Sequence, residues 1–405
     1  MSRENRDLII ENASVVTPTG VLDGASIKVV DGVIVEICMG HLHGIARRLD
    51  AEGLYVLPGF IDLHCDALEQ EIEPRAGASF PLNMAVFEMD KKLAACGITT
   101  MYHSVSFSPR QDGIRRSGLA DEIIREVNRL APSLGVRTRV HARFEISNAS
   151  SVPYLDRLLD EGRIHLFSIT DHTPGQGQYN DISLYLKMSK SVQGLDPAAS
   201  VEYINRRISE AVPLRTDYVV RLAGRCRSLG VPIASHDDDT EEKLDAMEEM
   251  GVTISEFPIN MATAISATHR GMHVSLGAPN VVRGNSTGNN LSARDAIRAG
   301  AGDILCSDYM PMSMVHAVFT LERAGVLPLY GAVNMASLNP ARAAGIDGAT
   351  GSIEAGKSAD LILMDASGEI PKVVKTFVQG REIFSTCRPP KDRICPTGEA
   401  LPDEA

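Results

Sequence analysis

Short apolar runs alternate with helical stretches between Pro58 and Gly345, and this alternation restricts the fold more than any other feature of the 405-residue chain. Eight runs have the composition of strands: YVLPGFIDLH, GITTMYHSVSF, VRTRVHARFE, RIHLFSITDH, VPIASHD, VTISEFP, MHVSLGAPN and DILCSD. Several are almost continuously hydrophobic, as are strands buried on both faces of a parallel sheet. Eight strand–helix units in roughly 290 residues predict a (β/α)8 barrel, an α/β fold of about 250 residues that tolerates insertions.

The stretches between these runs predict helices. The acidic segment DDDTEEKLDAMEEM predicts a helix over Thr240–Met250, because carboxylates favour the positive end of a helix. Further helices are predicted over Ser117–Leu134 and Ala211–Leu229, with a polar helical excursion over Tyr179–Val212. A doubly wound open sheet is the alternative fold. It would need a glycine-rich phosphate turn after the first strand, where the sequence instead reads HCDALEQE.

The two ends of the chain have a different pattern. Short Val/Ile runs broken by Gly and Asp occur over Leu8–Glu36 and Gly351–Phe384, and such runs predict strands and hairpins. Neither segment is long enough to bury a core alone. We therefore predict one β-sandwich domain from residues 1–57 and 346–386, beside a barrel domain of residues 58–345. The Pro-rich tail, 387–405, is predicted to be loosely ordered.

Charge and cysteine usage exclude several classes of partner and site. Acidic residues outnumber basic ones, 52 to 40, which gives a formal net charge of −12. Nucleic acids and anionic membranes need a basic face, so neither is expected as a partner. The first residues lack a signal-peptide pattern and no later run could span a bilayer, which predicts a cytoplasmic location. Seven cysteines without a CxxC pair predict reduced thiols rather than disulfides or a cysteine zinc site.

Polar residues end most of the predicted strands. The carboxyl ends of barrel strands meet at one mouth, where chemistry occurs in this fold. Six of the eight runs bring a His, Asp or Glu to that mouth: His64, Asp66, Glu145, Asp171, His172, His236, Asp237, Asp238, Glu256 and Asp308. Burying such groups is costly unless they are paired or bind a cation. A ring of imidazoles and carboxylates without matching lysines predicts a site for one or two divalent metals.

Residues at the mouth differ in how strongly the sequence favours a metal-binding or catalytic role over a structural one. His64 and Asp66 form the strongest pair, because residues two apart on a strand face the same side and can chelate one ion. Asp308 could bind metal and accept the proton of an attacking water, with helix N-capping as its alternative role. Cys65 is predicted to pack away from this face. A lone histidine such as His141 is predicted to be a satisfied structural residue.

Several motifs resemble a known family. LPGFIDLH, GITT, SHDD, CSDY, NPARAAGI and GSIEAGKSADLIL together resemble the amidohydrolase superfamily of metal-dependent (β/α)8 hydrolases. Within it, HCDALEQEIEPR, ITDHTPGQGQY, ASHDDDTEEKL, SEFPIN, LGAPNVVRGNSTGN and CSDYMP are similar to the phosphonate-metabolism branch known as PhnM. The similarity extends from the first β-segment to about Phe384. It implies hydrolysis of α-D-ribose 1-methylphosphonate 5-triphosphate with release of diphosphate.

The resemblance also implies a metal centre, expected to hold one or two zinc ions. Matched position by position, it assigns these ligands: His64, Asp66, His236 and Asp308, with Glu145 or His172 linking two ions. Many members of the superfamily take a histidine from the sixth strand, where this chain has Glu256, so Glu256 is a second candidate. Asp308 is expected to be the catalytic proton carrier.

A phosphorylated substrate would need cations and hydrogen-bond donors around its oxygens. Arg75 and Arg283 are the expected phosphate ligands, with surface salt bridges as their alternative role. The loop that contains Arg283 and Ser286 offers backbone N–H groups. The remaining substrate-binding candidates are Asp171, Gln176 and Glu256. Thr287 departs from the PhnM pattern, which often has a histidine there.

Three functions are compatible with these patterns. The first is a phosphoanhydride hydrolase that acts on a ribosyl phosphonate triphosphate. The second is an amidohydrolase or deaminase that cleaves a C–N bond of a small cyclic amide or N-acyl substrate. The third is a relative that kept the fold and lost its chemistry, which the full set of His, Asp and Glu residues disfavours. Self-association into a homo-oligomer is a further expectation from the superfamily.

Overall fold

Strands from both ends of the chain form one sheet, which we call the terminal sheet. The computed structural model describes residues 7–44, 46–109, 114–175, 177, 186, 196–286 and 290–386. The strands of the terminal sheet are β1 (Leu8–Thr17), β2 (Gly20–Val30), β3 (Val33–Met39), β4 (Arg47–Asp50), β5 (Tyr55–Pro58), β14 (Leu361–Asp365), β15 (Lys372–Val378) and β16 (Arg381–Ser385). Their order is β16-β15-β14-β5-β1-β2-β3, with β4 also paired to β1. The two chain ends meet where β14 runs antiparallel to β5, with Leu361 opposite Pro58. The predicted tail lies outside the described residues.

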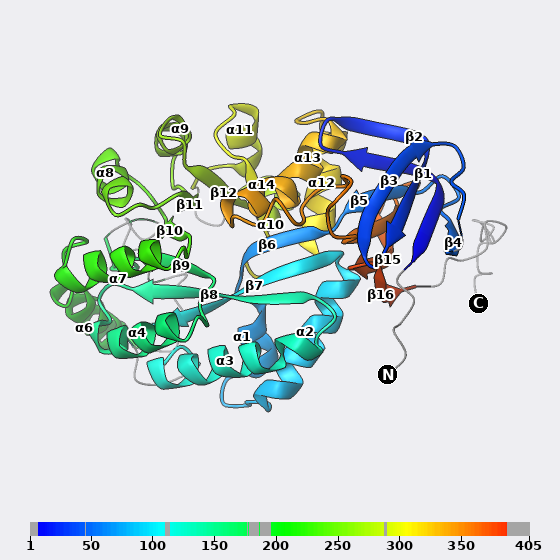
Figure 1. Ribbon diagram of the computed structural model, residues 1–405. Coiled ribbons are helices and arrows are strands. Elements are labelled where there is room, and N and C mark those ends of the chain that lie inside the picture. Colours follow the sequence, from blue (N-terminus) through cyan, green and yellow to red (C-terminus); the bar gives the residue numbers. More distant parts are fainter. Residues whose placement is uncertain are drawn as a thin grey trace, which may run out of the picture.

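The second sheet is the barrel, and it lies beside the terminal sheet (Figure 1). Its strands are β6 (Phe60–Cys65), β7 (Ile98–Phe107), β8 (Arg137–Glu145), β9 (Leu166–Thr170), β10 (Ile233–His236), β11 (Ile254–Glu256), β12 (His273–Gly277) and β13 (Ile304–Cys306). Neighbouring strands pair in parallel and in chain order from β6 to β13. A parallel bridge between Cys65 and Asp308 closes the ring between β6 and β13. The predicted (β/α)8 barrel with a β-unit built from both chain ends is confirmed, and the open-sheet alternative is wrong.

Helices cover the outside of the barrel (Figure 1). They are α1 (Ala67–Ile72), α2 (Leu82–Ala95), α3 (Ser117–Leu130), α4 (Val152–Asp160), α6 (Pro197–Ser209), α7 (Asp217–Ser228), α8 (Glu241–Glu249), α9 (Met261–His269), α10 (Ala278–Arg283), α11 (Ala293–Arg298), α12 (Ser313–Arg323), α13 (Leu329–Ala336) and α14 (Leu338–Ala343), with short 3-10 helices at Ala131–Ser133 and Ala149–Ser151. Among the described helices, α6, α8, α9 and α11 begin at side-chain caps; in α8, for example, the Thr240 hydroxyl accepts the Lys243 N–H. Within the described ranges, no helix has the length and apolar character needed to cross a bilayer.

One predicted helix begins later than its pattern suggested. The helix predicted over Ala211–Leu229 begins only at Asp217, because residue 213 is a proline and Thr216 takes the extended backbone of an N-cap. The predicted excursion over Tyr179–Val212 is described at 186 and 196–212 and otherwise lies outside the described residues; its last part forms α6.

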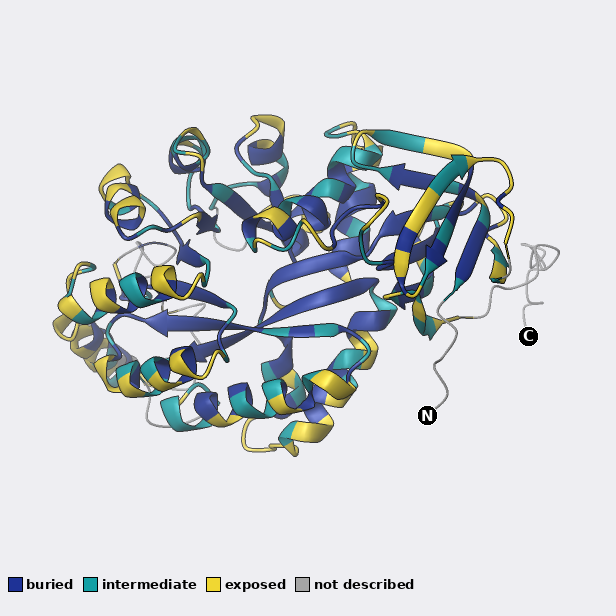
Figure 2. Ribbon diagram, in the orientation of Figure 1, coloured by how far each residue is buried: buried dark blue, intermediate teal, exposed yellow. Residues whose placement is uncertain are grey.

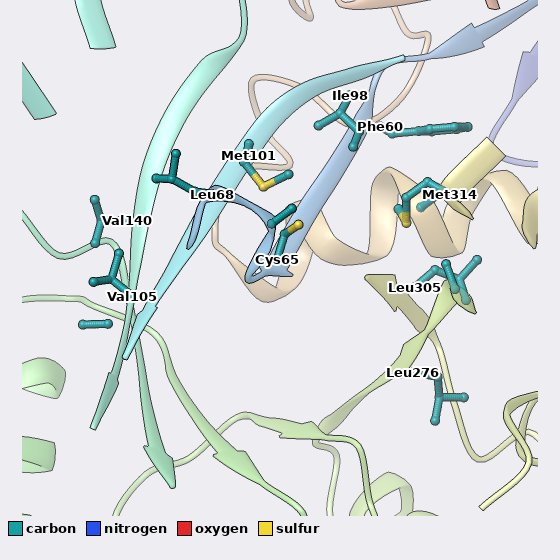
Figure 3. Close-up of a cluster of buried hydrophobic side chains, with 14 of the residues drawn as sticks. Phe60, Cys65, Leu68, Ile98, Met101, Val105, Val140, Leu276, Leu305 and Met314 are labelled. Atoms are coloured by element: carbon teal, nitrogen blue, oxygen red, sulfur yellow. The ribbon is translucent and has the colours of Figure 1, made fainter. Parts of the chain in front are cut away.

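Apolar side chains fill the layer between the barrel strands and the helices. Figure 3 shows part of this cluster, with Phe60, Met101 and Val105 on the strands and Met314 on α12. Cys65 belongs to the same cluster and is 1% exposed, so its thiol packs among apolar groups as predicted. Figure 2 shows the barrel strands buried over most of their length, while the outer helix faces are largely exposed or intermediate. At the mouth, the buried side chains include the polar residues His64, His236 and Glu256.

Candidate metal centre at the barrel mouth

A β-bulge at the end of β6 directs the first functional side chain. Asp62 pairs with Met101 and Cys65 pairs with His103, so β6 gains one residue relative to β7 across this interval. The extra residue breaks the simple alternation of sides. As a result Cys65 packs in the outer apolar layer, while the His64 ring meets the imidazoles and carboxylates inside the barrel.

Three buried residues deep in the barrel form what we call the inner cluster: His64, His141 and Glu256. All are at most 1% exposed, and one ligand atom of each lies within 4.8 Å of the other two. His64 Nδ1 is 3.1 Å from Glu256 Oε1, and His141 Nε2 is 4.0 Å from Glu256 Oε2. The opposite nitrogen of His141, Nδ1, lies 3.0 Å from the Leu63 carbonyl oxygen, which directs Nε2 toward Glu256.

The ligand atoms of the inner cluster have no hydrogen bonds to the described part of the chain. Among the described residues, His64 Nδ1, His141 Nε2 and both Glu256 carboxylate oxygens have no hydrogen-bond partner. Burial lowers the pKa of His64 and of His141 to about 3 each and raises the pKa of Glu256. Neutral imidazoles with free lone pairs beside a carboxylate are the donor set that divalent metals of the zinc type prefer. The prediction that His141 is a satisfied structural residue is therefore wrong.

A second group, the outer cluster, consists of His172, His236 and Asp237, whose ligand atoms also lie within 4.8 Å of one another. His236 Nδ1 is 3.1 Å from Asp237 Oδ2, and His172 Nε2 is 3.8 Å from the same oxygen. Within the described part of the chain, neither His236 Nδ1 nor Asp237 Oδ2 has a hydrogen-bond partner. The His64 and His236 rings are 5.5 Å apart, so the two clusters are neighbours.

Glu145 holds one histidine of the outer cluster in place. Its carboxylate lies 2.7 Å from His172 Nδ1 and accepts the His172 backbone N–H at 2.9 Å. Arg207, on α6, contacts the same carboxylate at 3.7 Å. Fixing Nδ1 in this way leaves His172 Nε2 facing Asp237, which is the arrangement of a carboxylate behind a metal-binding histidine. Glu145 was predicted as a link between two ions, and the structure places it behind His172.

Left-handed backbone marks three strand ends at the mouth. Asp237, Phe257 and Asp308 have φ of 53°, 55° and 59°, immediately or shortly after β10, β11 and β13. Such angles are unfavourable for a residue as bulky as phenylalanine, and they concentrate at functional sites. The Phe257 ring packs edge-on against His64 at 5.0 Å and His236 at 5.3 Å, so one side chain touches both clusters.

Asp66 is engaged by two arginines. Arg143 Nη1 donates to both Asp66 oxygens, at 2.9 and 2.8 Å, and Arg115 Nη2 donates to Oδ2 at 3.1 Å. Burial alone would raise the pKa of Asp66, but these guanidinium groups hold it well below its usual range. The predicted chelating partner, His64 Nε2, is 4.0 Å from Asp66 Oδ1. Asp66 is thus near the inner cluster and charged.

Asp308 lies at the closure of the barrel. Its backbone N–H donates to the His64 carbonyl at 2.9 Å, and its carbonyl accepts the Asp66 N–H at 2.6 Å. Burial raises the pKa of Asp308 to about 7, and the charge of Asp66 adds to the effect. A carboxyl with a pKa near neutrality is suited to taking up and releasing a proton.

The predicted substrate-binding residues fall in different places. Arg75 and Arg283 are exposed, and Ser286 is half-buried near the end of α10. The Asp171 carboxylate accepts the Thr173 N–H at 3.0 Å. Gln176 and Thr287 lie outside the described residues. Glu256, predicted as a substrate or metal residue, belongs to the inner cluster.

Sequence reasoning missed four residues of the site: His141, Arg143, Arg115 and Phe257. The sequence did contain a signal for two of them. Side chains alternate along a strand, so His141 and Arg143 share the face of Glu145 on β8. The positions of Arg115 and Phe257 depend on loop backbone and on tertiary packing, which no local pattern reports.

Comparisons with known proteins identify relatives over most of the chain. Residues 226–383 match the amidohydrolase family. The chain is 30% identical over 382 residues to the α-D-ribose 1-methylphosphonate 5-triphosphate diphosphatase of Escherichia coli strain K12, covering 93% of this chain and 100% of that protein. This match also confirms the predicted resemblance to the PhnM branch.

Solved structures agree on the fold. Dihydropyrimidinase from Brevibacillus agri NCHU1002 superposes with a TM-score of 0.60 at 13% identity, covering 94% of this chain and 95% of that one. An adenosine deaminase from Xanthomonas campestris with bound zinc gives a TM-score of 0.61 at 16% identity, covering 94% and 93%. At these identities the likeness supports the barrel architecture alone. On the strength of its full-length relative, the chain is a hydrolytic enzyme and belongs to the amidohydrolase superfamily, in the PhnM branch.

Proposed function

We propose that the protein is a metal-dependent phosphoanhydride hydrolase that releases diphosphate from α-D-ribose 1-methylphosphonate 5-triphosphate. The observation that carries this proposal is the pair of neighbouring clusters of buried donor atoms at the mouth. The full-length relative with that named activity supplies the substrate class. Zinc as the metal and a cytoplasmic location are parts of the same proposal.

The inner and outer clusters would hold the metal. Their unpartnered imidazole nitrogens and carboxylate oxygens fit a divalent cation, since burying them without any partner is unfavourable. A cation bound there supplies Lewis-acid stabilisation of phosphoryl oxygens and makes a nearby water more acidic. Asp66 and Asp308, both predicted ligands, lie beside the clusters and are the proposed additional donors.

Asp308 is the proposed proton acceptor in this hydrolysis. Its raised pKa of about 7 leaves a substantial share ionised near neutral pH, ready to take the proton of an attacking water. Bond formation between the water oxygen and phosphorus would then accompany breakage of the phosphoanhydride bond, with diphosphate as the leaving group. Arg75, Arg283, Ser286, Asp171 and Gln176 remain the proposed contacts to the rest of the substrate.

A product assay tests this proposal. Purified protein, stripped of metal and then reloaded with zinc, is given the ribosyl triphosphate, and diphosphate and orthophosphate are quantified separately. Stoichiometric diphosphate that appears only with metal is the expected result. Orthophosphate alone would contradict the bond assignment. No phosphate release, together with ammonia or amine from a cyclic amide, would favour the C–N hydrolase instead.

A further inference from the structure

Arg143 is unusual among the described cations at the mouth because it lies inside the ring of donors. It projects from β8 and is 5% exposed. Its Nη1 contacts Asp66, and its Nη2 is 3.2 Å from His236 Nε2 in the outer cluster. Its charge also influences the pKa of His64 and Glu256 in the inner cluster. The guanidinium therefore lies between the two clusters.

Among the described residues, the carboxylate in direct contact with this buried cation is that of Asp66. Burying a guanidinium is tolerated only when an anion compensates it, and arginine stays charged at any physiological pH. Arg115 shares Asp66 but also contacts Glu69 at 2.8 Å. Counted as charges, Arg115 and Glu69 balance each other, and Arg143 and Asp66 balance each other. Arg143 Nε has no hydrogen-bond partner among the described residues.

Asp66 is also a proposed metal ligand, and both of its carboxylate oxygens already accept hydrogen bonds from arginines. A carboxylate that turns to a cation gives up part of its interaction with Arg143. The guanidinium then needs a replacement anion at the same place. Phosphate oxygens match its planar donors as well as a carboxylate does, because both groups accept paired N–H bonds.

We infer that Arg143 is a phosphate-binding residue: Asp66 occupies its donors in this structure, and a phosphoryl oxygen of the substrate replaces Asp66 when that carboxylate turns to a bound cation. The ligand class is a phosphoryl oxygen of a di- or triphosphate. The inference rests on the proposed phosphorylated substrate. It predicts that metal and phosphate strengthen each other's binding, because coupling between two ligands is reciprocal.

Calorimetry with inorganic phosphate as the probe tests the inference. The full chain is titrated after metal removal, and again after loading with stoichiometric zinc and removal of excess metal. In the wild type, loading should tighten phosphate binding about tenfold or more, as expected for hydrogen bonds to a charged group. R143Q should lose most of this gain while retaining metal. R129Q is the matched control, since Arg129 is an exposed residue paired with Glu126 on α3.

Two results would overturn the phosphate-binding role of Arg143. Equal phosphate affinity of zinc-loaded R143Q and wild type would overturn the inference, as would a wild type whose affinity ignores zinc. If R143Q does not fold, R143K replaces it. Lysine keeps the charge but lacks the paired N–H donors, so phosphate binding should be weaker at full metal content. Unchanged phosphate binding by R143K would overturn the inference. Phosphate binding that depends on Arg143 without diphosphate release would instead reject the proposed function alone.

Discussion

The inner and outer clusters contain the same kinds of donor but differ in what surrounds them. The inner cluster is fully buried, and its His141 is oriented by a backbone carbonyl. The outer cluster includes the half-buried His172, which is oriented by the Glu145 carboxylate with Arg207 behind it. An enclosed cation exchanges slowly, whereas a cation beside solvent is accessible to substrate. The difference suggests that the inner cluster anchors metal and the outer cluster meets substrate.

The largest effect is expected at Asp308, the proposed proton acceptor, whose backbone N–H donates to the His64 carbonyl of the inner cluster. D308N should lower turnover about 100-fold or more, because the amide cannot accept a proton. Asparagine tolerates the left-handed backbone at this position, so the thermal midpoint should change little. Steady-state kinetics and thermal unfolding measure the two effects. Near-normal turnover in D308N would remove Asp308 from the mechanism.

The next largest effect is a difference between the two clusters in how strongly each retains its metal. E256Q removes a charged donor from the inner cluster and should abolish the slowly exchanging metal. E145Q leaves every outer donor in place but weakens the support of His172, so affinity should fall about 10- to 100-fold. Metal analysis after timed exposure to a chelator measures both. If E256Q and E145Q lose metal to the chelator at the same rate and to the same extent, the inner and outer clusters do not differ in metal retention.

The smallest expected effect is on the pH dependence of the free energy of unfolding, measured after metal has been removed. The folded pKa of His141, about 3, lies below the unfolded value near 6.5, so the unfolded chain binds more protons between these limits. Its contribution to stability is present above pH 6.5 and is lost as pH falls. H141N should therefore show a shallower decline in the free energy of unfolding from pH 6.5 to 5, by up to about 1.4 kcal/mol per pH unit.

Urea unfolding of metal-stripped protein across this pH range measures the slopes. H269N, at an exposed position on α9, is the matched control and should follow the wild type. If H141N and the wild type lose stability equally, His141 is not held neutral by burial.

The sequence predicted the barrel well because its signals are local and repeated. Eight apolar runs with helices between them specify parallel strands, and the strand ends placed His64, His172, His236 and Glu256 near one mouth. The orientation of individual side chains at the mouth depends instead on irregular backbone geometry. The bulge before Cys65 decides which way His64 faces, and the left-handed backbone of Asp237 turns its carboxylate toward His236. Neither is visible in residue type or spacing.

Crystals of the zinc-loaded protein, measured at the zinc absorption edge, show directly where the ions bind. We expect anomalous density within coordination distance of His64, His141 and Glu256, and of His172, His236 and Asp237. Density held by other residues, or a loaded crystal with no density at either cluster, would contradict this expectation.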